Sequence, residues 1–324
     1  MPTPRYYFTR LSIPNMKVYN AIWAGLAAYK SEITLPEMSI DEADKVFRYV
    51  LKDNPILFHI DSFMYTTYPG DKCVLKPRYK YPHHVAKKYK EKVLKHLRNF
   101  DAAKSLNDFK KECFVHDYCL KHFTYDYSFG EHAHSVLGPV LHNKAVCSGI
   151  SKFVSLAFDY LDIKCLIVTG DGIDPISGKR EPHAWNIVNI DGLTYHLDVT
   201  YDICLTTHFS RYDYFNLPDK DIKKDHVIKD DVPPCTTEGQ DYYTRTLQVA
   251  SSPSQLTHYI EDKIRKGQKH IAFKVLNAHG KEDIYDRVLD LAADSYIKIV
   301  NRGVYVQVSH NKDQMVIELI FNEQ

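Results

Sequence analysis

The sequence has no excess of charge of either sign, and it contains only 2 tryptophans. Its 324 residues include 42 Lys and Arg against 41 Asp and Glu, which gives a formal net charge of +1. This balance provides no overall attraction to nucleic acid or to an anionic membrane, so we expect neither as a partner. The one basic run, at residues 87–92, includes a glutamate and is typical of a solvated helix face.

Paired cysteines are also missing. The seven cysteines are an odd number without a CxxC pair, which argues against a disulfide framework and a structural zinc site and favours a reducing compartment. The N-terminal segment has no apolar signal-peptide core, and no stretch approaches membrane-spanning length. We therefore expect a cytoplasmic protein, or a secreted one if an export signal has been removed.

The pattern of apolar residues predicts an α+β protein in three parts. Residues 1–105 are expected to be mostly helical, with a capping box at Ser39-Ile40-Asp41-Glu42 and a strand or hairpin near residues 57–68. Residues 106–230 change in character and contain the clearest strand signals. A Pro-containing linker at residues 230–234 then leads to a small α/β domain at residues 235–324.

Two local predictions concern strand ends. The apolar run from Lys164 to Thr169 is expected to end in a turn at Gly170-Asp171-Gly172. Beyond the linker, Tyr242–Val249 is expected to be the first strand of the C-terminal domain, followed by a helix that starts after Ser-Pro.

Cys147 is the strongest candidate for a nucleophile. It stands at the predicted start of a helix whose apolar face includes Ile150, Phe153 and Val154. Free backbone N–H groups and the helix dipole stabilise a thiolate at such a position, and the same groups can bind a developing oxyanion. Taken alone, a small buried thiol is the commoner role of a cysteine.

A predicted β-hairpin supplies a base for this thiol. Asp191-Gly192 between two β-rich runs predicts a two-residue turn, which pairs His183 with Thr200 and Trp185 with Asp198. The four side chains then share one face, with the Cβ atoms of His183 and Asp198 roughly 7–8 Å apart. An aspartate that orients one imidazole nitrogen leaves the other to face a thiol. A purely structural His–Asp pair is the alternative.

Three sequence blocks resemble the signature of the transglutaminase-like superfamily. They are Lys144-Ala145-Val146-Cys147-Ser148-Gly149, Glu181-Pro182-His183-Ala184-Trp185-Asn186, and Tyr195-His196-Leu197-Asp198-Val199-Thr200-Tyr201-Asp202. Cys, His and Asp occur in the family's order. The resemblance covers about residues 1–230, and the runs at residues 115–126, 212–217 and 225–226 are similar to bacterial members. One departure is Gly149-Ile150-Ser151, where the family usually has Gly-Tyr-Ala.

The resemblance implies a papain-like core in which the Cys-bearing helix packs on an antiparallel sheet. It implies Cys147, His183 and Asp198 as a catalytic triad, with Asp198 on the strand paired to that of His183. Residues that could donate to the oxyanion or support the triad are Asn143, Tyr125, Ser148, Trp185 and Asp202. A surface role for Asn143, core packing for Tyr125 and Trp185, and a turn cap for Asp202 are the alternatives.

The function that this pattern predicts is cysteine-dependent acyl transfer through a thioester, with no metal or organic cofactor. We expect a peptide or protein amide as substrate, and hydrolysis in preference to cross-linking, because similar small proteins often lack the accessory domains of cross-linking enzymes. The alternatives are a catalytically idle module that binds peptide or cell-wall fragments, and a structural protein without a site. His132-x-His134 and His83-His84 lack the further ligands that a metal site needs.

Overall fold

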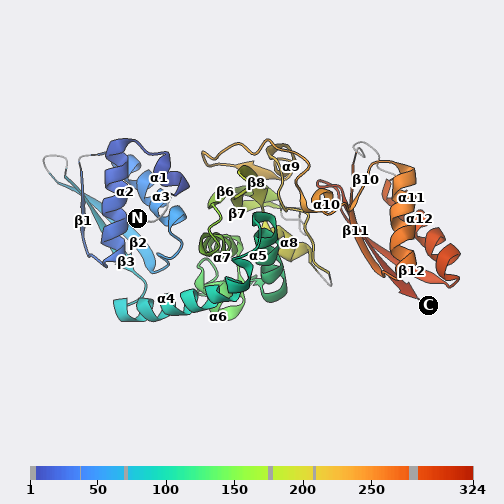
Figure 1. Cartoon of the computed structure of the whole chain (residues 1–324). Helices are drawn as coiled ribbons and strands as arrows, with labels where there is room; N and C mark the ends of the chain where they lie inside the picture. Colours follow the sequence, from blue (N-terminus) through green and yellow to red (C-terminus); the bar gives the residue numbers. More distant parts are fainter. Residues whose placement is uncertain are drawn as a thin grey trace.

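The chain forms three units arranged in a row (Figure 1). The computed structural model describes residues 5–36, 38–68, 72–173, 178–206, 209–276 and 284–323. Each unit has its own cluster of buried apolar side chains. Within the described ranges, no helix combines the length and the apolar character that crossing a membrane requires.

The N-terminal unit packs helices against a three-stranded antiparallel sheet of order β1-β3-β2. Its elements are α1 (Tyr6–Thr9), α2 (Ile13–Ala27), β1 (Ile33–Leu35), α3 (Ile40–Asp53), β2 (Ile60–Tyr68) and β3 (Lys72–Tyr79). Ser39 caps the start of α3, because its Oγ accepts a hydrogen bond of 3.2 Å from the N–H of Glu42, whereas the Glu42 carboxylate accepts from Asn15 Nδ2 at 2.8 Å. The region near residues 57–68 is one arm of a hairpin.

The central unit places α7 across a four-stranded antiparallel sheet of order β8-β7-β6-β9. The strands are β6 (Cys165–Ile173), β7 (Arg180–Ile190), β8 (Leu193–Leu197) and β9 (His226–Ile228), with the short pair β4 (Thr124–Tyr125) and β5 (Lys144–Ala145) beside them. The helices are α4 (His83–Leu97), η1 (Arg98–Ala103), α5 (Asp108–His122), α6 (Leu137–His142), α7 (Cys147–Tyr160), α8 (Val199–Leu205) and α9 (Asp219–Ile222). The predicted α+β class, with a Cys-bearing helix on an antiparallel sheet, is confirmed.

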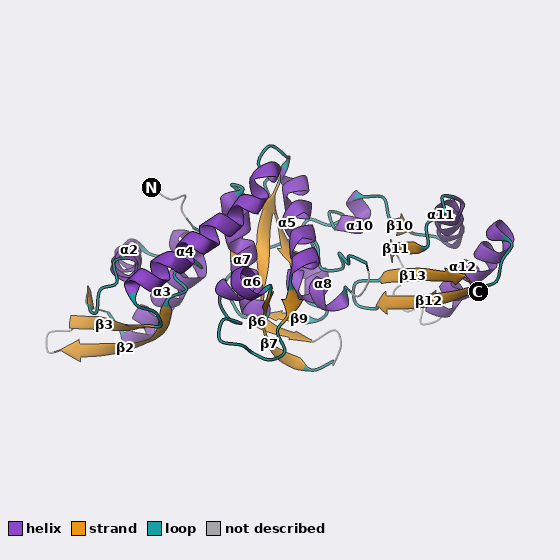
Figure 2. Cartoon of the chain, turned by 90° about the horizontal axis from the view of Figure 1, so that it is seen from below, coloured by secondary structure: helices purple, strands orange, loops and turns teal. Residues whose placement is uncertain are grey.

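The central core begins before residue 106. Val93 and Leu97 of α4 and Phe100 of η1 are buried in the same cluster as Phe153 of α7. In Figure 2, α4 runs from the N-terminal unit alongside the central one. The predicted boundary at residue 105 therefore lies within the central core. The sequence of α4 is rich in lysine, and its narrow apolar face, which packs on α7, was not recognised as part of that core.

The C-terminal unit has a sheet of order β10-β11-β13-β12 with α11 and α12 packed together on it (Figure 1). Its elements are α10 (Tyr242–Arg245), β10 (Val249–Ala250), α11 (Pro253–Arg265), β11 (His270–Val275), α12 (Ile284–Val300), β12 (Val304–Asn311) and β13 (Val316–Glu323). The predicted strand at Tyr242–Val249 is wrong. Asp241 caps a helical turn instead, because its Oδ1 accepts a hydrogen bond of 3.2 Å from the N–H of Thr244.

The predicted turn at Gly170-Asp171-Gly172 is also wrong, because β6 continues through all three residues. The two glycines do not reverse the chain. They allow neighbouring segments to approach β6 closely. A Cβ on Gly170 would overlap the carbonyl oxygen of Val227 in β9, and one on Gly172 would overlap the hydroxyl of Tyr201 in α8. These two positions let β9 and α8 come close to the end of β6 that pairs with His183.

Substituting Gly170 with alanine should therefore destabilise the protein. The added methyl group would force β9 away from β6, and overpacking of this kind costs about 1–3 kcal/mol. Gly130→Ala is the control, because its Cβ would meet only the end of the Asp126 side chain, at 3.1 Å. Urea unfolding of both variants measures the difference. Equal stability of the two variants would contradict the close-approach role of Gly170.

Candidate active site

Cys147 is the first residue of α7, as predicted. Val146, in extended conformation, precedes it as the N-cap, and the thiol-bearing residue is half-buried. The N–H groups that open a helix have no partner inside it, so those of Cys147 and Ser148 are available to a bound anion. Gly149, in the first turn of α7, lets the start of the helix lie close to the chain at Ala133, because a Cβ at this position would overlap the carbonyl oxygen of Ala133.

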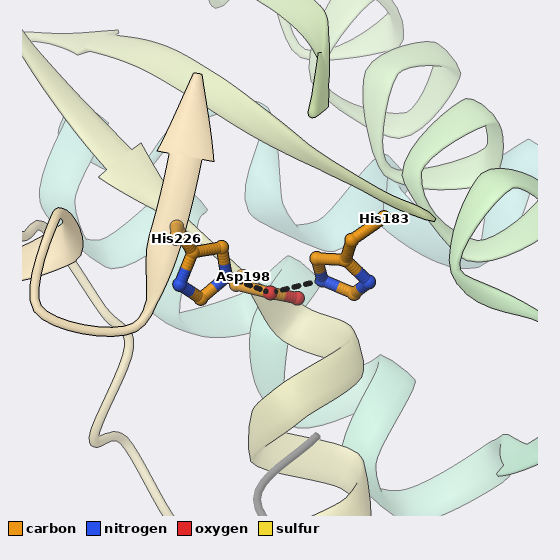
Figure 3. Close-up of side chains that lie close together, drawn as sticks. All are labelled: His183, Asp198 and His226. Atoms are coloured by element: carbon orange, nitrogen blue, oxygen red, sulfur yellow. Dashed lines mark hydrogen bonds and ion pairs between the residues drawn. The ribbon is translucent and has the colours of Figure 1, made fainter. Parts of the chain in front are cut away.

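His183 lies in β7, and its imidazole bonds to Asp198. The Nε2–H of His183 donates to Asp198 Oδ2 at 2.6 Å (Figure 3). Cys147 lies close enough to this ring to contribute to the raised pKa of His183, so the imidazole lies near both the thiol and the carboxylate. Burial alone would lower the pKa of His183, but the charge of Asp198 and the hydrogen bonds to Asp198 and Cys147 outweigh it and raise the pKa to about 10. The imidazole is therefore protonated at neutral pH.

Asp198 occupies a different kind of position from the one predicted. The hairpin has the predicted register, with Ile190 opposite Leu193, but pairing stops at Asn186 and Leu197. Asp198 is the N-cap of α8, so the expected pairing of Trp185 with Asp198 does not form. The strand ends because the Asp198 side chain caps the next helix, a function that a paired strand residue could not perform.

Thr200 is therefore helical and does not face His183. Asp198 Oδ1 accepts hydrogen bonds from the N–H groups of Thr200 and Tyr201, at 2.9 and 3.1 Å. The side chain of Asp198 is fully buried. Burial alone would raise its pKa, but the charges and hydrogen bonds of His183 and His226 reverse this and hold the pKa far below its usual value.

Two of the predicted supporting residues lie near His183 or Cys147. Trp185 is buried, and its ring stacks at 5.9 Å from that of His183, so it keeps water from one side of the imidazole. Tyr125 in β4 is close enough for the charge of Cys147 to contribute to its raised pKa, after the larger effect of burial.

The side chains of the other three predicted residues have different partners. Asn143 is exposed and ends α6 with a φ of 54°, which fits the alternative of a surface residue. Ser148 follows Cys147 in the chain, and its Oγ lies 3.0 Å from Nδ1 of His134. Asp202 contacts His116 of α5 at 2.9 Å and the N–H of Tyr214 at 3.1 Å, so it fixes α8 to its neighbours without touching the triad side chains.

His226 is a site residue that sequence reasoning missed. It starts β9, and its Nε2 lies 3.0 Å from Asp198 Oδ2, on the same carboxylate oxygen that His183 contacts (Figure 3). The only signal in the sequence was the Asp225-His226 pair, which resembles bacterial family members and suggested no role. The contact depends on the antiparallel pairing of β9 with β6, which no local pattern reveals.

Two groups of side chains in the described part of the chain have the spacing that a metal ion would need: His183, Asp198 and His226, and His196, Asp219 and Cys235. In the first group, each imidazole donates a proton to Asp198. In the second group, Trp185 Nε1–H donates to His196 Nδ1 at 3.0 Å, so the proton of the neutral ring sits on Nε2, 2.9 Å from Asp219. Hydrogen bonds therefore account for both groups.

No family model matches the sequence. No curated protein matches it either. Among solved structures, one titled "Crystal structure of a TGase" is 17% identical, with a TM-score of 0.32 over 56% of this chain and 54% of that one. Another, titled "The Crystal Structure of a Putative Cysteine Protease from Cytophaga hutchinsonii", is 13% identical, with a TM-score of 0.30 over 44% of this chain and 62% of that one. This chain thus spans less than two thirds of either protein.

Replacing His183 with glutamine should change how stability depends on pH. The folded pKa of about 10 lies above the unfolded value of ~6.5, so the folded protein retains a proton that the unfolded chain loses. The resulting stabilisation is complete below pH ~6.5 and disappears as pH rises toward 10. We expect His183→Gln to lose most stability near pH ~6 and least near pH ~10, measured by urea unfolding.

His196→Gln is a matched control with the opposite sign. Burial lowers the pKa of His196 despite the opposing effect of Asp219, so His196 stabilises the fold above pH ~6.5 and less in acid. A loss of stability that is independent of pH in His183→Gln would refute the protonated state of His183.

Proposed function

We propose that this chain is a cysteine-dependent enzyme that cleaves an amide bond through a thioester at Cys147. The observation that carries the proposal is that the imidazole of His183 lies near Cys147, at the start of α7, and is hydrogen-bonded to the buried carboxylate of Asp198. A protonated imidazole beside a thiol at a helix N-terminus favours the thiolate, which is the reactive form of cysteine.

The reaction follows from these positions. The Cys147 sulfur attacks the amide carbonyl carbon, and a C–S bond forms. His183 gives its proton to the leaving nitrogen as the C–N bond breaks, which releases the amine and leaves a thioester. His183 then takes a proton from water as the water oxygen attacks the thioester carbon. The C–S bond breaks, and the products are a carboxylic acid and the Cys147 thiolate beside the protonated His183. Asp198 keeps the ring oriented during both proton transfers.

The carbonyl oxygen becomes negatively charged when the sulfur attacks, and hydrogen-bond donors must stabilise that charge. The N–H groups of Cys147 and Ser148 stand at the helix start, where the helix dipole adds to their effect. The hydroxyl of Tyr125, close to Cys147, is our choice for a side-chain donor. Trp185 covers one face of the His183 ring and limits its contact with water.

We favour a peptide or protein amide as substrate and water as the acyl acceptor. Cys147 is half-buried and not enclosed, so water can reach the thioester. The resemblance to small members of the superfamily that lack cross-linking accessory domains supports the same choice.

Iodoacetamide should label Cys147 in preference to the other half-buried thiols at pH ~6, below the free-thiol pKa of ~8.5. Burial raises the pKa of Cys113 to about 12 and also raises that of Cys165, so these two thiols should react slowly. Intact-protein and peptide mass spectrometry measures the labelling of each cysteine.

His183→Ala is the paired variant for this experiment. Labelling of Cys147 at pH ~6 should fall by at least about tenfold in it, because the thiolate loses its imidazolium partner. If wild-type Cys147 reacts no faster than the other thiols, the thiolate is not activated, and a catalytically idle module that binds peptide or cell-wall fragments becomes the better explanation.

A second experiment separates hydrolysis from transfer. The protein is incubated with dimethylated casein and a fluorescent primary amine, and casein is then analysed for cleaved or deamidated peptides and for incorporated amine. We expect cleavage or deamidation with little incorporation, because water competes at a concentration of about 55 M at a half-buried site. Cys147→Ser should abolish both products. Incorporation that exceeds hydrolysis would show cross-linking activity instead.

A further inference from the structure

The buried histidine His226 has no counterpart in the Cys–His–Asp triad. It is 2% exposed and lies at the edge of the sheet, where its strand pairs with Gly172 of β6. Its ring contacts Trp185 edge-on at 4.9 Å and Tyr201 at 4.7 Å. Because aromatic rings from β7 and α8 fix its orientation, His226 cannot turn away from Asp198 without disturbing the core.

Both ring nitrogens of His226 contact carboxylates. Nε2 lies 3.0 Å from Asp198 Oδ2, and Nδ1 lies 2.5 Å from Asp225 Oδ1. Carboxylates at these distances accept hydrogen bonds, so both nitrogens carry protons and the ring is a cation. Burial alone would lower the pKa of His226, but the hydrogen bonds and charges of Asp198 and Asp225 raise it overall.

Asp225 is held in turn from two sides. The hydroxyl of Tyr214 donates to Asp225 Oδ2 at 2.6 Å. Gln314, from the connection between β12 and β13 in the C-terminal unit, brings its Nε2 to 3.5 Å from the same oxygen and donates to the carbonyl of Asp221 at 3.2 Å. The second histidine is thus fixed by contacts that extend into the C-terminal unit.

The charges of this cluster balance. His183 and His226 are cations, and Asp198 and Asp225 are anions, so four buried charged groups are neutral together. With His183 alone, Asp198 would have one cationic partner and Asp225 would have no cation at hydrogen-bonding distance among the described residues. A buried carboxylate without a partner is costly, so His226 satisfies both anions.

We propose that His226 is a positioning residue of the active site, which acts through Asp198 to hold the imidazole of His183 against Cys147. His226 donates a hydrogen bond to Asp198 Oδ2, the same oxygen that accepts from His183. Asp225 binds the other ring nitrogen of His226 and holds the ring in place. The inference rests on the proposed function, because it assigns to His226 the support of that triad. The Asp225–His226 pair therefore belongs to the site, although it touches neither the thiol nor the position of the substrate.

Several titratable groups surround His226, and the experiment must separate the effect of His226 from theirs. They are Asp198 and Tyr201 from α8 and its N-cap, His183 from β7, His196 from β8, Asp225 next in the chain, and Tyr214. His196 has a comparable buried position and its own carboxylate partner, Asp219, but does not contact Asp198. His196→Gln is therefore the matched control.

The test compares His226→Gln and the double variant Asp225→Asn/His226→Gln with wild type and His196→Gln. The double variant removes one cation and one anion, so it keeps the net charge while Asp198 loses its second cation. We expect the acid limb of the pH profile for Cys147 alkylation to move to higher pH in both His226 variants. At pH ~6, the rate should fall at least about tenfold, which corresponds to one pKa unit.

Circular dichroism and thermal melting establish that each variant is folded before the pH dependence of Cys147 alkylation is measured. If His226 served stability alone, the melting temperature would fall and the acid limb would stay where it is in wild type and in His196→Gln. That result would overturn the proposal, because a role through Asp198 requires the shift.

A measurement independent of reactivity separates this inference from the proposed function. NMR of histidine labelled with ¹⁵N reports directly on the protonation of each ring nitrogen. In wild type at pH ~7, both nitrogens of His226 should carry protons, whereas a free histidine with a pKa of ~6.5 is mostly neutral. In the double variant, the Nε2–H signal of His183 should shift, because its acceptor has lost a partner.

Failure of wild-type Cys147 to react selectively would refute the proposed function alone. A neutral His226, or an unchanged His183 signal in the double variant, would refute the positioning role whatever the thiol does.

Discussion

The arrangement of the central unit depends on one buried carboxylate. Asp198 accepts four hydrogen bonds, two from the backbone at the start of α8, one from His183 in β7 and one from His226 in β9. A fully buried anion is tolerated only when such partners compensate for its lost hydration. The ends of two strands and the start of a helix must therefore meet at Asp198, and the imidazole of His183 is aimed at Cys147 as a result.

Glycines make this meeting possible. A side chain at Gly170 would collide with β9, and one at Gly172 would collide with the hydroxyl of Tyr201, so the sheet edge could not approach α8. The absence of a side chain at these two positions thus helps to set the geometry of the site. The close packing also excludes water from Asp198, which strengthens its hydrogen bonds to the imidazoles.

The C-terminal unit is joined to the central unit by a second buried ion network. Arg211 is almost fully buried and binds Asp213 through two hydrogen bonds, at 3.0 and 2.7 Å, and Glu318 of β13 at 3.1 Å. His270 of β11 contacts the other oxygen of Glu318 at 2.8 Å. Because the buried Arg211–Glu318 pair crosses the boundary between the two units, docking of the C-terminal unit also holds Gln314 near Asp225.

The sequence by itself determined the helix that begins at Cys147 and the register of the hairpin that carries His183, and it singled out Cys147, His183 and Asp198 as candidate site residues. These depend on contacts between residues close in the chain: a helix start, an Asp-Gly turn and the alternation of side chains along a strand. The tertiary structure decided where Asp198 leaves the strand, that Gly170 lies inside a strand, and that His226 joins the site. Those features arise from pairing between segments distant in sequence, where hydrogen bonds to a buried charge outweigh local preference.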